Sequence, residues 1–185
     1  NSVTLNMSSF SVFEQMGGSI QSGLELSLST VVTTLAGTGS SGSANGTGTA
    51  ASFNNPYGIT TDGTNIYVSG WQSNLIRQIV ISTGVVSTLA GSGTGGTANG
   101  TGTAASFHKP VSITTDGRNV YVAEYYNKSW IRQIVISTGV VTTLAGSGSS
   151  GSANGTGTAA SFSGPYGITT DGTNVYVSDR SNHLI

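Results

Sequence analysis

Short apolar runs alternate with turn residues along most of the chain, and this pattern predicts strands. Residues 57–61 and 65–69 contain β-branched and aromatic residues, and an Asp-Gly pair, a strong turn signal, separates them. Residues 75–81 and 85–90 are two further apolar runs, separated by Ser-Thr-Gly. No window combines a helical period with helix caps. We therefore expect four short strands in an antiparallel meander.

The same pattern recurs at a nearly constant interval. Asp62, Asp116 and Asp171 mark the same turn, and the segment at 31–37 returns in full at 140–146. Such self-similarity is typical of propellers and solenoids, in which each unit buries its apolar faces by stacking on copies of itself. We expect an all-β fold: a β-propeller-type array of four-stranded antiparallel blades, about 3.5 blades in this chain, with an incomplete ring. The residues of the first repeat expected in the core are Ile59, Ile66, Val68, Ile79 and Leu89.

The interval divides the chain into four parts. Residues 38–91 and 92–146 are complete repeats, and residues 147–185 are a third repeat, cut short inside its third strand. Residues 1–37 align with the second repeat after one deletion, so we interpret them as a degenerate first blade or N-terminal assembly strands. An unrelated leader strand is the alternative. Because an unfinished blade exposes strand edges, we expect either further sequence after Ile185 or a second copy that completes or extends the ring.

The linkers between repeats are rich in glycine, serine and threonine. We expect each to form a compact surface loop pinned by a phenylalanine, which is Phe53, Phe107 or Phe162. Each linker also carries Asn-Gly-Thr. This triplet is a glycosylation sequon, and Asn-Gly is equally a tight-turn signal. The candidate glycosylation sites are Asn45, Asn99 and Asn154.

The last repeat contains the most distinctive motif. Pro-Tyr-Gly-Ile-Thr-Thr-Asp-Gly-Thr-Asn-Val-Tyr-Val-Ser-Asp at 165–179 is followed by Ser-Asn-His-Leu-Ile at 181–185, and similar segments recur in register in the earlier copies. This repeat resembles the NHL repeat, which is named for Asn-His-Leu and builds β-propellers, commonly of six blades. Asn74 and Ser129 stand where His183 falls, so only the last copy spells the motif. The resemblance implies a propeller of a bacterial secreted type. Because the family includes lyases, RNA-binding modules, sensors and interaction platforms, the resemblance assigns no activity.

Composition narrows the class of partner. Only 7% of residues are charged, against about 25% in an average soluble domain. We therefore expect hydroxyl and amide groups, not charged groups, to form most of the surface that contacts water. With a net charge of −1 and six Lys plus Arg, the chain lacks the basic surface that nucleic acid or anionic lipid requires. No apolar run approaches about 18 residues, the length that spans a membrane. We expect no nucleic acid partner, no membrane insertion, and a location outside the cell or on its surface.

Catalytic and metal-binding chemistry is sparse. The two histidines, His108 and His183, are too few for a zinc site, which needs three or four ligands, and cysteine is absent. The aspartates of the turns are expected to cap backbone N–H groups. No Ser/His/Asp constellation recurs, so we expect no enzyme activity, no catalytic residue, no metal and no cofactor. The ionic contacts expected inside the blades are the structural pairs of Asp62 with Arg77 and of Asp116 with Arg132.

Exposed aromatic residues are the candidate contacts. The loop after the second strand varies between repeats while the framework is constant, which is how propellers acquire binding specificity. The residues expected to contact a ligand or partner, or alternatively to pack between blades, are Trp71, Tyr125, Tyr126 and Trp130. The residues expected at an assembly contact, because they depart from the repeat, are Phe10, Val12, Phe13 and Met16.

Two functions from different classes fit these patterns. The first is a non-catalytic extracellular repeat protein that acts as a structural, self-assembling or surface-interaction scaffold. Its partners would be its own copies, in a homo-oligomer or polymer, or another surface protein. The alternative is a ligand-binding propeller, a lectin-like or sensor module that presents the variable aromatic loops to a glycan.

Overall fold

The structure, a computed structural model, describes residues 2–6, 29–125 and 129–185. It comprises two compact units, Asn1–Leu35 and Ala36–Ile185. The described residues are almost entirely β-structure, and the all-β class predicted from the sequence is confirmed. Their helices are three single 3₁₀ turns, η1 (Gly48–Ala50), η2 (Gly102–Ala104) and η3 (Gly157–Ala159).

The first unit contains a two-stranded antiparallel ladder. In it β1 (Ser2–Asn6) pairs with β2 (Ser29–Thr33), and Ser2 lies opposite Thr33. In a degenerate blade these segments would belong to the first and fourth strands of a meander, with two strands between them. Their direct pairing therefore differs from the strand order that we expected for residues 1–37.

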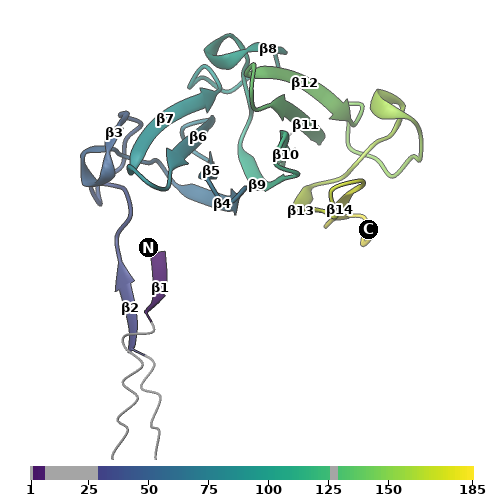
Figure 1. Cartoon of the computed structure of the whole chain (residues 1–185). Coiled ribbons are helices and arrows are strands. Elements are labelled where there is room, and N and C mark those ends of the chain that lie inside the picture. Colours follow the sequence, from purple (N-terminus) through teal and green to yellow (C-terminus); the bar gives the residue numbers. More distant parts are fainter. Residues whose placement is uncertain (1, 7–28, 126–128) are drawn as a thin grey trace, which may run out of the picture. The chain divides into compact units, whose positions relative to one another are not determined.

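The second unit contains two complete blades and two strands of a third (Figure 1). The strands of the first blade are β4 (Pro56–Thr61), β5 (Asn65–Gly70), β6 (Leu75–Val80) and β7 (Val85–Ala90). Those of the second are β9 (Pro110–Thr115), β10 (Asn119–Glu124), β11 (Trp130–Val135) and β12 (Val140–Ala145). The third contributes β13 (Pro165–Thr170) and β14 (Val175–Asp179). Consecutive strands pair antiparallel, so the predicted array of four-stranded blades is confirmed, and the ring is not closed in this chain.

Each linker before a complete blade adds a two-residue strand to the outer edge of that blade. β3 (Gly46–Thr47) pairs with β7, and β8 (Gly100–Thr101) pairs with β12. Next to β3, Gly48 donates its N–H to Gly84 O at 2.8 Å, and both glycines have positive φ, 56° and 68°. Glycine adopts this left-handed conformation without the steric cost that a side chain imposes. The linker therefore covers part of the outer edge before it reaches the inner strand of the same blade.

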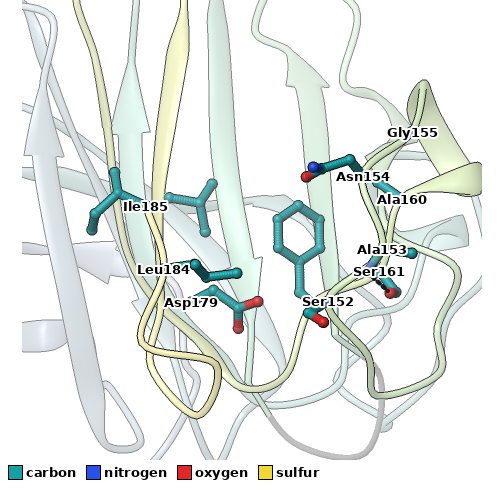
Figure 2. A pocket seen from close by; sticks show the side chains of 11 residues that line it. Ser152, Ala153, Asn154, Gly155, Ala160, Ser161, Asp179, Leu184 and Ile185 are labelled. Atoms are coloured by element: carbon teal, nitrogen blue, oxygen red, sulfur yellow. Dashed lines mark hydrogen bonds between the residues drawn. The ribbon is translucent and has the colours of Figure 1, made fainter.

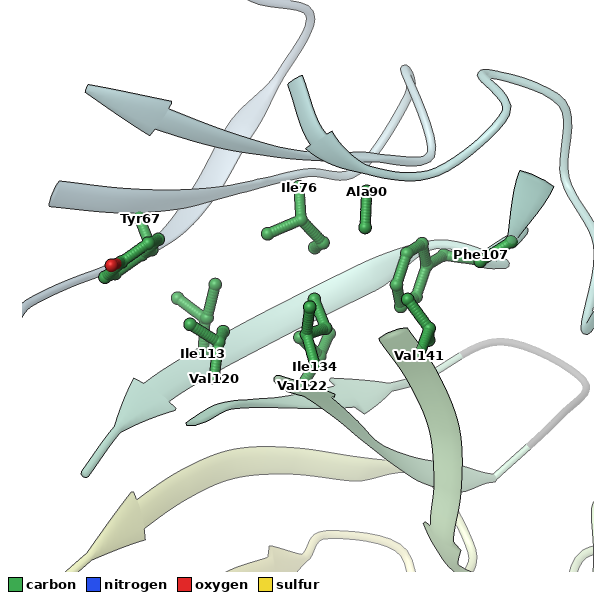
Figure 3. Close-up of a cluster of buried hydrophobic side chains, with 10 residues drawn as sticks. Tyr67, Ile76, Ala90, Phe107, Ile113, Val120, Val122, Ile134 and Val141 are labelled. Atoms are coloured by element: carbon green, nitrogen blue, oxygen red, sulfur yellow. The ribbon is translucent and has the colours of Figure 1, made fainter. Parts of the chain in front are cut away.

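Apolar side chains between neighbouring blades form the core. The inner strands β4, β9 and β13 lie side by side, with β9 in the middle (Figure 1). Between the first two repeats, Tyr67, Ile76 and Ala90 of the first pack against the second (Figure 3). The residues of the second repeat in this cluster are Ala105, Phe107, Ile113, Val120, Val122, Ile134 and Val141. A second cluster, of Val111, Ala123, Ile131 and Ile168, joins the second repeat to β13. Each blade therefore needs a neighbour to bury its faces.

One repeat position shows this dependence directly. Ile113 and Ile168 are 5% and 9% exposed, whereas Ile59, at the same position of the first blade, is 67% exposed. Within residues 36–185 no blade precedes β4, so the face that carries Ile59 has no neighbour in this unit. The expectation that Ile59 is buried is therefore wrong. The other residues expected in this core are buried (Val68 and Ile79) or half-buried (Ile66 and Leu89).

Ile113→Ala and Ile59→Ala form a matched pair of variants. Ile113→Ala should lower the free energy of unfolding by about 2–5 kcal/mol, because it leaves a cavity between two packed blades. Ile59→Ala should lower it by less than about 1 kcal/mol, because that side chain is already largely solvated. Urea unfolding followed by circular dichroism measures both changes. Equal losses in the two variants would contradict the difference in burial.

Candidate functional site

An aspartate-centred turn joins the first and second strands of every repeat. In the first repeat, Asp62 Oδ1 accepts two backbone N–H groups at 2.8 and 2.7 Å, and Oδ2 accepts the Tyr67 hydroxyl at 2.8 Å. Asp116 and Asp171 make the same contacts in the later repeats. The prediction that these carboxylates cap the turns is confirmed.

These hydrogen bonds change the acidity of the aspartates. Burial raises the pKa of Asp116, but hydrogen bonds from Asn119, Tyr121 and a second backbone N–H outweigh it and lower the pKa from 3.8 to about 2. The same balance lowers the pKa of Asp62, and hydrogen bonds alone lower the pKa of the exposed Asp171. The folded turn therefore stabilises the charged form of each carboxylate.

Each complete blade holds a buried arginine against its own linker. In the first blade Arg77, which is 2% exposed, donates from Nη1 to Ser52 O at 3.0 Å. Its Nη2 donates to Ala44 O at 3.0 Å and to Asn45 Oδ1 at 2.9 Å. The guanidinium carbon lies 5.3 Å from the centroid of the Phe53 ring. We call these four linker residues and their repeat counterparts the arginine site.

The second blade repeats the arginine site. Arg132 is fully buried and donates to Ser106 O and Ala98 O, each at 3.1 Å. It also donates to Asn99 Oδ1 at 2.9 Å and lies 5.2 Å from the centroid of the Phe107 ring. In both blades the linker phenylalanine therefore lies against the guanidinium, which fixes the loop to the third strand.

The predicted pairs of Asp62 with Arg77 and of Asp116 with Arg132 are wrong. Asn65, which ends the Asp62 turn, lies opposite Val80 of β6. Arg77 is three residues from Val80, so it is displaced from the turn by about 10 Å along the strand. The second blade has the same geometry. Each aspartate is satisfied by its turn, and each arginine is held by carbonyl groups of the linker.

In the second blade the arginine also has an ionic partner. Arg132 Nη1 lies 3.1 Å from Glu124 Oε1, and both side chains are fully buried. Burial raises the pKa of Glu124, and the guanidinium opposes that effect. Gly70 occupies this position in the first blade, so Arg77 has neutral partners there. The sequence contained a signal for this difference, because the last residue of the second strand changes from glycine to glutamate and, in the third repeat, to Asp179.

The three candidate glycosylation sites have different surroundings. The amide oxygens of Asn45 and Asn99 accept hydrogen bonds from the buried arginines of their blades. The side chain of Asn154 hydrogen-bonds to none of the described residues. Sequence reasoning missed the arginine contacts, although the recurrence of Ala-Asn-Gly-Thr in every linker pointed to a structural role. Glycosylation stays a prediction for all three.

Four aromatic rings from three repeats meet at one end of the blades. Tyr57 and Tyr166 lie at the start of the inner strands β4 and β13, and Trp71 and Tyr125 directly follow β5 and β10. Trp71 lies 5.7 Å from Tyr57 and 6.0 Å from Tyr125, between ring centroids. Tyr166 meets Tyr57 and Tyr125 edge to face, at 6.1 and 5.5 Å. We call these four residues the aromatic cluster.

The aromatic cluster is partly accessible and carries polar groups. Tyr57 and Tyr166 are 53% and 37% exposed, and their hydroxyls hydrogen-bond to each other. Arg180 donates to the Tyr125 hydroxyl at 2.9 Å, and its guanidinium carbon lies 5.7 Å from the Tyr166 ring centroid. The Lys109 ammonium lies 5.0 Å from the centroid of the Trp71 ring. Such a surface offers ring faces for stacking, and hydroxyl and cationic groups for hydrogen bonds at their edges.

The structure brings together two of the four aromatic residues predicted as contacts. Trp71 and Tyr125 belong to the aromatic cluster, and both are half-buried and also pack against the core cluster of Val111 and Ile168, as the alternative of packing between blades predicts. Trp130 does not belong to the aromatic cluster, because its ring lies near Arg132 and packs against Gly148 of the following linker, which matches the alternative of packing between repeats. Tyr126 lies outside the described residues. So do the four predicted assembly contacts, Phe10, Val12, Phe13 and Met16.

Sequence reasoning missed Tyr57 and Tyr166. The available signal was the segment Pro-Tyr-Gly, which opens the inner strand in the first and third repeats and is Pro-Val-Ser in the second. It also missed Arg180, which occupies the position of Trp71 and Tyr125 in the third repeat.

The histidine of the Asn-His-Leu motif lies at a special backbone position. His183 has a φ of 58°, and Asn74 at the same point of the first repeat has a φ of 53°. Asparagine and histidine are among the residues that tolerate this left-handed conformation best, which explains why either is found there. In the described part of the chain, no three His, Asp or Glu side chains gather as metal ligands would. No described helix has the length and apolar character needed to cross a membrane.

No family model matches this chain, and no curated protein matches it either. Among solved structures, a protein of unknown function from Bacteroides thetaiotaomicron is 27% identical with a TM-score of 0.57, over 63% of this chain and 30% of that one. An auxiliary nutrient binding protein from the same organism is 23% identical with a TM-score of 0.59, over 68% and 35% of the two chains. Another, from Bacteroides ovatus, is 22% identical with a TM-score of 0.55, over 65% and 33%.

These similarities concern the fold. Together with the stacked antiparallel blades, they place the chain among β-propeller-type proteins. The chain spans about a third of the length of the three solved structures. The motifs suggest membership in the NHL-repeat family, but no family model matches the chain, so this membership is a proposal.

The aspartate turns predict how stability depends on pH. Since folding lowers the pKa of Asp116 from 3.8 to about 2, its charge contributes stability that is present above pH 3.8 and is lost as the pH falls to about 2. Asp116→Asn, which does not titrate, should cost about 1 kcal/mol at neutral pH and progressively less toward the acid end. Urea unfolding of both proteins across this range measures the difference. A constant difference between the two would contradict the role of the charge.

Proposed function

We propose that this chain is a non-catalytic binding scaffold of the NHL-repeat type, located outside the cell or on its surface, and that its aromatic cluster takes a glycan. The observation that carries this proposal is the meeting of Tyr57, Trp71, Tyr125 and Tyr166, from three repeats, at one place where the two tyrosines of the inner strands are exposed. Single exposed aromatic residues are ordinary on protein surfaces, whereas a contiguous accessible group indicates an interaction surface.

A glycan suits the chemistry of the aromatic cluster. The C–H faces of a sugar ring can stack on indole and phenol rings, and its hydroxyls can hydrogen-bond with the tyrosine hydroxyls at the ring edges. Arg180 and Lys109 lie beside these rings and supply further donors. With only 7% charged residues, the chain as a whole favours a neutral ligand over a strongly anionic polymer.

Two further observations support the proposal. Two of the structurally similar proteins are named as auxiliary nutrient binding proteins, so the fold is compatible with a binding role. The hydroxyl-rich, charge-poor surface of the repeats supports a location outside the cell.

A glycan array followed by isothermal titration calorimetry tests the glycan-binding proposal. The protein should bind at least one neutral oligosaccharide saturably. Trp71→Ala should weaken that binding by at least about tenfold, or about 1.4 kcal/mol, because the indole contacts two other rings of the aromatic cluster.

Tyr176→Ala is the matched control for this experiment. Tyr176 is 45% exposed, similar to Tyr166, but lies opposite Thr169, toward the other end of the β13–β14 pair. Its removal should leave binding unchanged. Absence of saturable binding by the unmodified protein, or an equal loss in both variants, would refute the assignment of the ligand surface.

A second candidate function, the self-assembling structural scaffold, is supported by the first blade. Ile59 is 67% exposed on the face of β4 whose counterpart in the second blade, with Ile113, packs against a neighbour. A blade of a second copy could cover this face in the same way. Such head-to-tail contacts between unlike surfaces close into rings or continue as filaments.

Light scattering tests the assembly hypothesis at micromolar protein concentration. The protein should have a mass above that of one chain, and Ile59→Lys should restore the mass of one chain, because it places a charge in the contact. Ile81→Lys, at a position that is 39% exposed in the turn after β6, is the control and should assemble normally. A stable folded monomer of the unmodified chain would exclude this function.

A further inference from the structure

A cavity lies in the third repeat at the place where the first two repeats bury an arginine. Its volume is about 250 Å³. Its lining includes Ala153, Asn154, Ser161 and Phe162, the counterparts of the arginine site. In the first blade the same four positions are Ala44, Asn45, Ser52 and Phe53, and all four contact Arg77.

The polar groups around this cavity include several hydrogen-bond acceptors. Figure 2 shows Asp179 on one side of the cavity and Asn154 and Ser161 on the other. Asp179 is 4% exposed, and its carboxylate accepts the Ser163 N–H at 2.7 Å and the Asn182 side-chain amide at 2.6 Å. A buried carboxylate with only neutral donors is well placed to pair with a cation.

The second blade shows which cation completes such a site. Glu124 is the counterpart of Asp179, and it likewise accepts a backbone N–H, from His108 at 3.3 Å. Its remaining partner is the guanidinium of Arg132 at 3.1 Å. The third repeat therefore contains the acceptor set of the second blade, including the carboxylate.

The strand register of the third repeat also matches. Leu184 bridges Asp179 antiparallel, as Leu75 pairs with Gly70 at the start of β6. In the first blade the arginine lies two residues beyond that leucine, opposite Val68. A strand that continued the same register beside β14 would place an arginine opposite Val177, which lines the cavity.

We propose that this cavity binds the guanidinium of an arginine carried by a β-strand that pairs with β14. The occupant is an extended segment of this protein's own repeat type that begins at the arginine, with the Arg-Gln-Ile-Val sequence that ends β6, because Leu184 and Ile185 already occupy the positions of Leu75 and Ile76. Arg77 and Arg132 are 2% and 0% exposed in their blades, so a strand already folded into a blade cannot supply the arginine. Strand addition provides main-chain hydrogen bonds, and the arginine site provides selectivity. This site is separate from the aromatic cluster and does not depend on its ligand.

The geometry selects a guanidinium over an ammonium group. In the filled sites one arginine donates to two carbonyl oxygens and one amide oxygen of the linker at once, and in the second blade also to a carboxylate. A planar guanidinium has five donors in a fixed arrangement that suits this set, whereas a lysine has three donors on a single nitrogen. The neighbouring phenylalanine ring adds a face on which the planar group can stack.

Binding of a synthetic peptide tests this proposal on the unmodified 185-residue chain. The peptide has the sequence of residues 77–91, which contain the end of β6 and all of β7, and it carries a fluorescent label for anisotropy measurements. It should bind saturably. The Arg77→Lys and Arg77→Gln peptides should each bind at least about tenfold more weakly. No binding of the unchanged peptide, or equal binding of all three, would overturn the proposal.

Variants of the protein provide an independent comparison. Asp179→Asn should weaken binding of the unchanged peptide by about tenfold, because it removes the carboxylate from the cavity. Asp171→Asn also removes one aspartate charge, but at the turn between β13 and β14, and it should bind the peptide normally. If circular dichroism shows that Asp179→Asn is unfolded, the comparison of the three peptides on the unmodified protein still tests the proposal. Equal affinities of the two folded variants would contradict the assignment.

Discussion

The buried arginine of the third strand is the interaction on which each complete blade depends. In the first blade it connects three segments: its own strand β6, the linker through Ser52 O, and the outer strand through Ser87 O at 3.4 Å. A charge removed from water is costly unless hydrogen bonds or an opposite charge compensate it. In the second blade, where Arg132 pairs with Glu124, loss of one partner of the buried ion pair should cost about 3–5 kcal/mol. Because most of the acceptors are linker carbonyls, the backbone of the linker has to keep one conformation. A segment that looks like a flexible glycine-rich spacer in the sequence is therefore an ordered part of the blade.

Packing between blades is the second constraint, and it makes the environment of a residue depend on its neighbours as much as on its own repeat. The strands alone leave apolar side chains on both faces, so burial follows from what stacks on each side. Ile113 lies between two blades and Ile59 does not, although the surrounding sequences are nearly the same. For the same reason Phe107 is fully buried, whereas Phe53 is only half-buried. The repeated sequence thus specifies the interface, and the neighbouring blade determines whether that interface is filled.

The strands, the aspartate turns and the stacked-blade architecture were predictable because each depends on short-range rules. Apolar runs and Asp-Gly pairs identify strands and turns locally, and the repeat interval indicates stacking. The partners of Arg77 were not predictable from charge alone, since its acceptors are mainly backbone carbonyls, which every residue possesses. The aromatic cluster depends on which repeats meet, because Tyr57 and Tyr166 are 109 residues apart. The added strands β3 and β8 have two residues each, too few for any periodicity to be visible.

Differences between the repeats are concentrated at the end of the blades opposite the aspartate turns. At the turns, Thr-Thr-Asp-Gly recurs in all three copies, and each aspartate accepts several hydrogen bonds, so a substitution there would remove several contacts together. At the opposite end, Trp71, Tyr125 and Arg180 occupy one repeat position. Their side chains contact rings of other repeats through stacking and cation contacts, which tolerate a range of ring sizes and angles better than hydrogen-bonded turns do. Side chains can therefore change at this end without loss of the strands, which explains why the partly accessible aromatic cluster lies there.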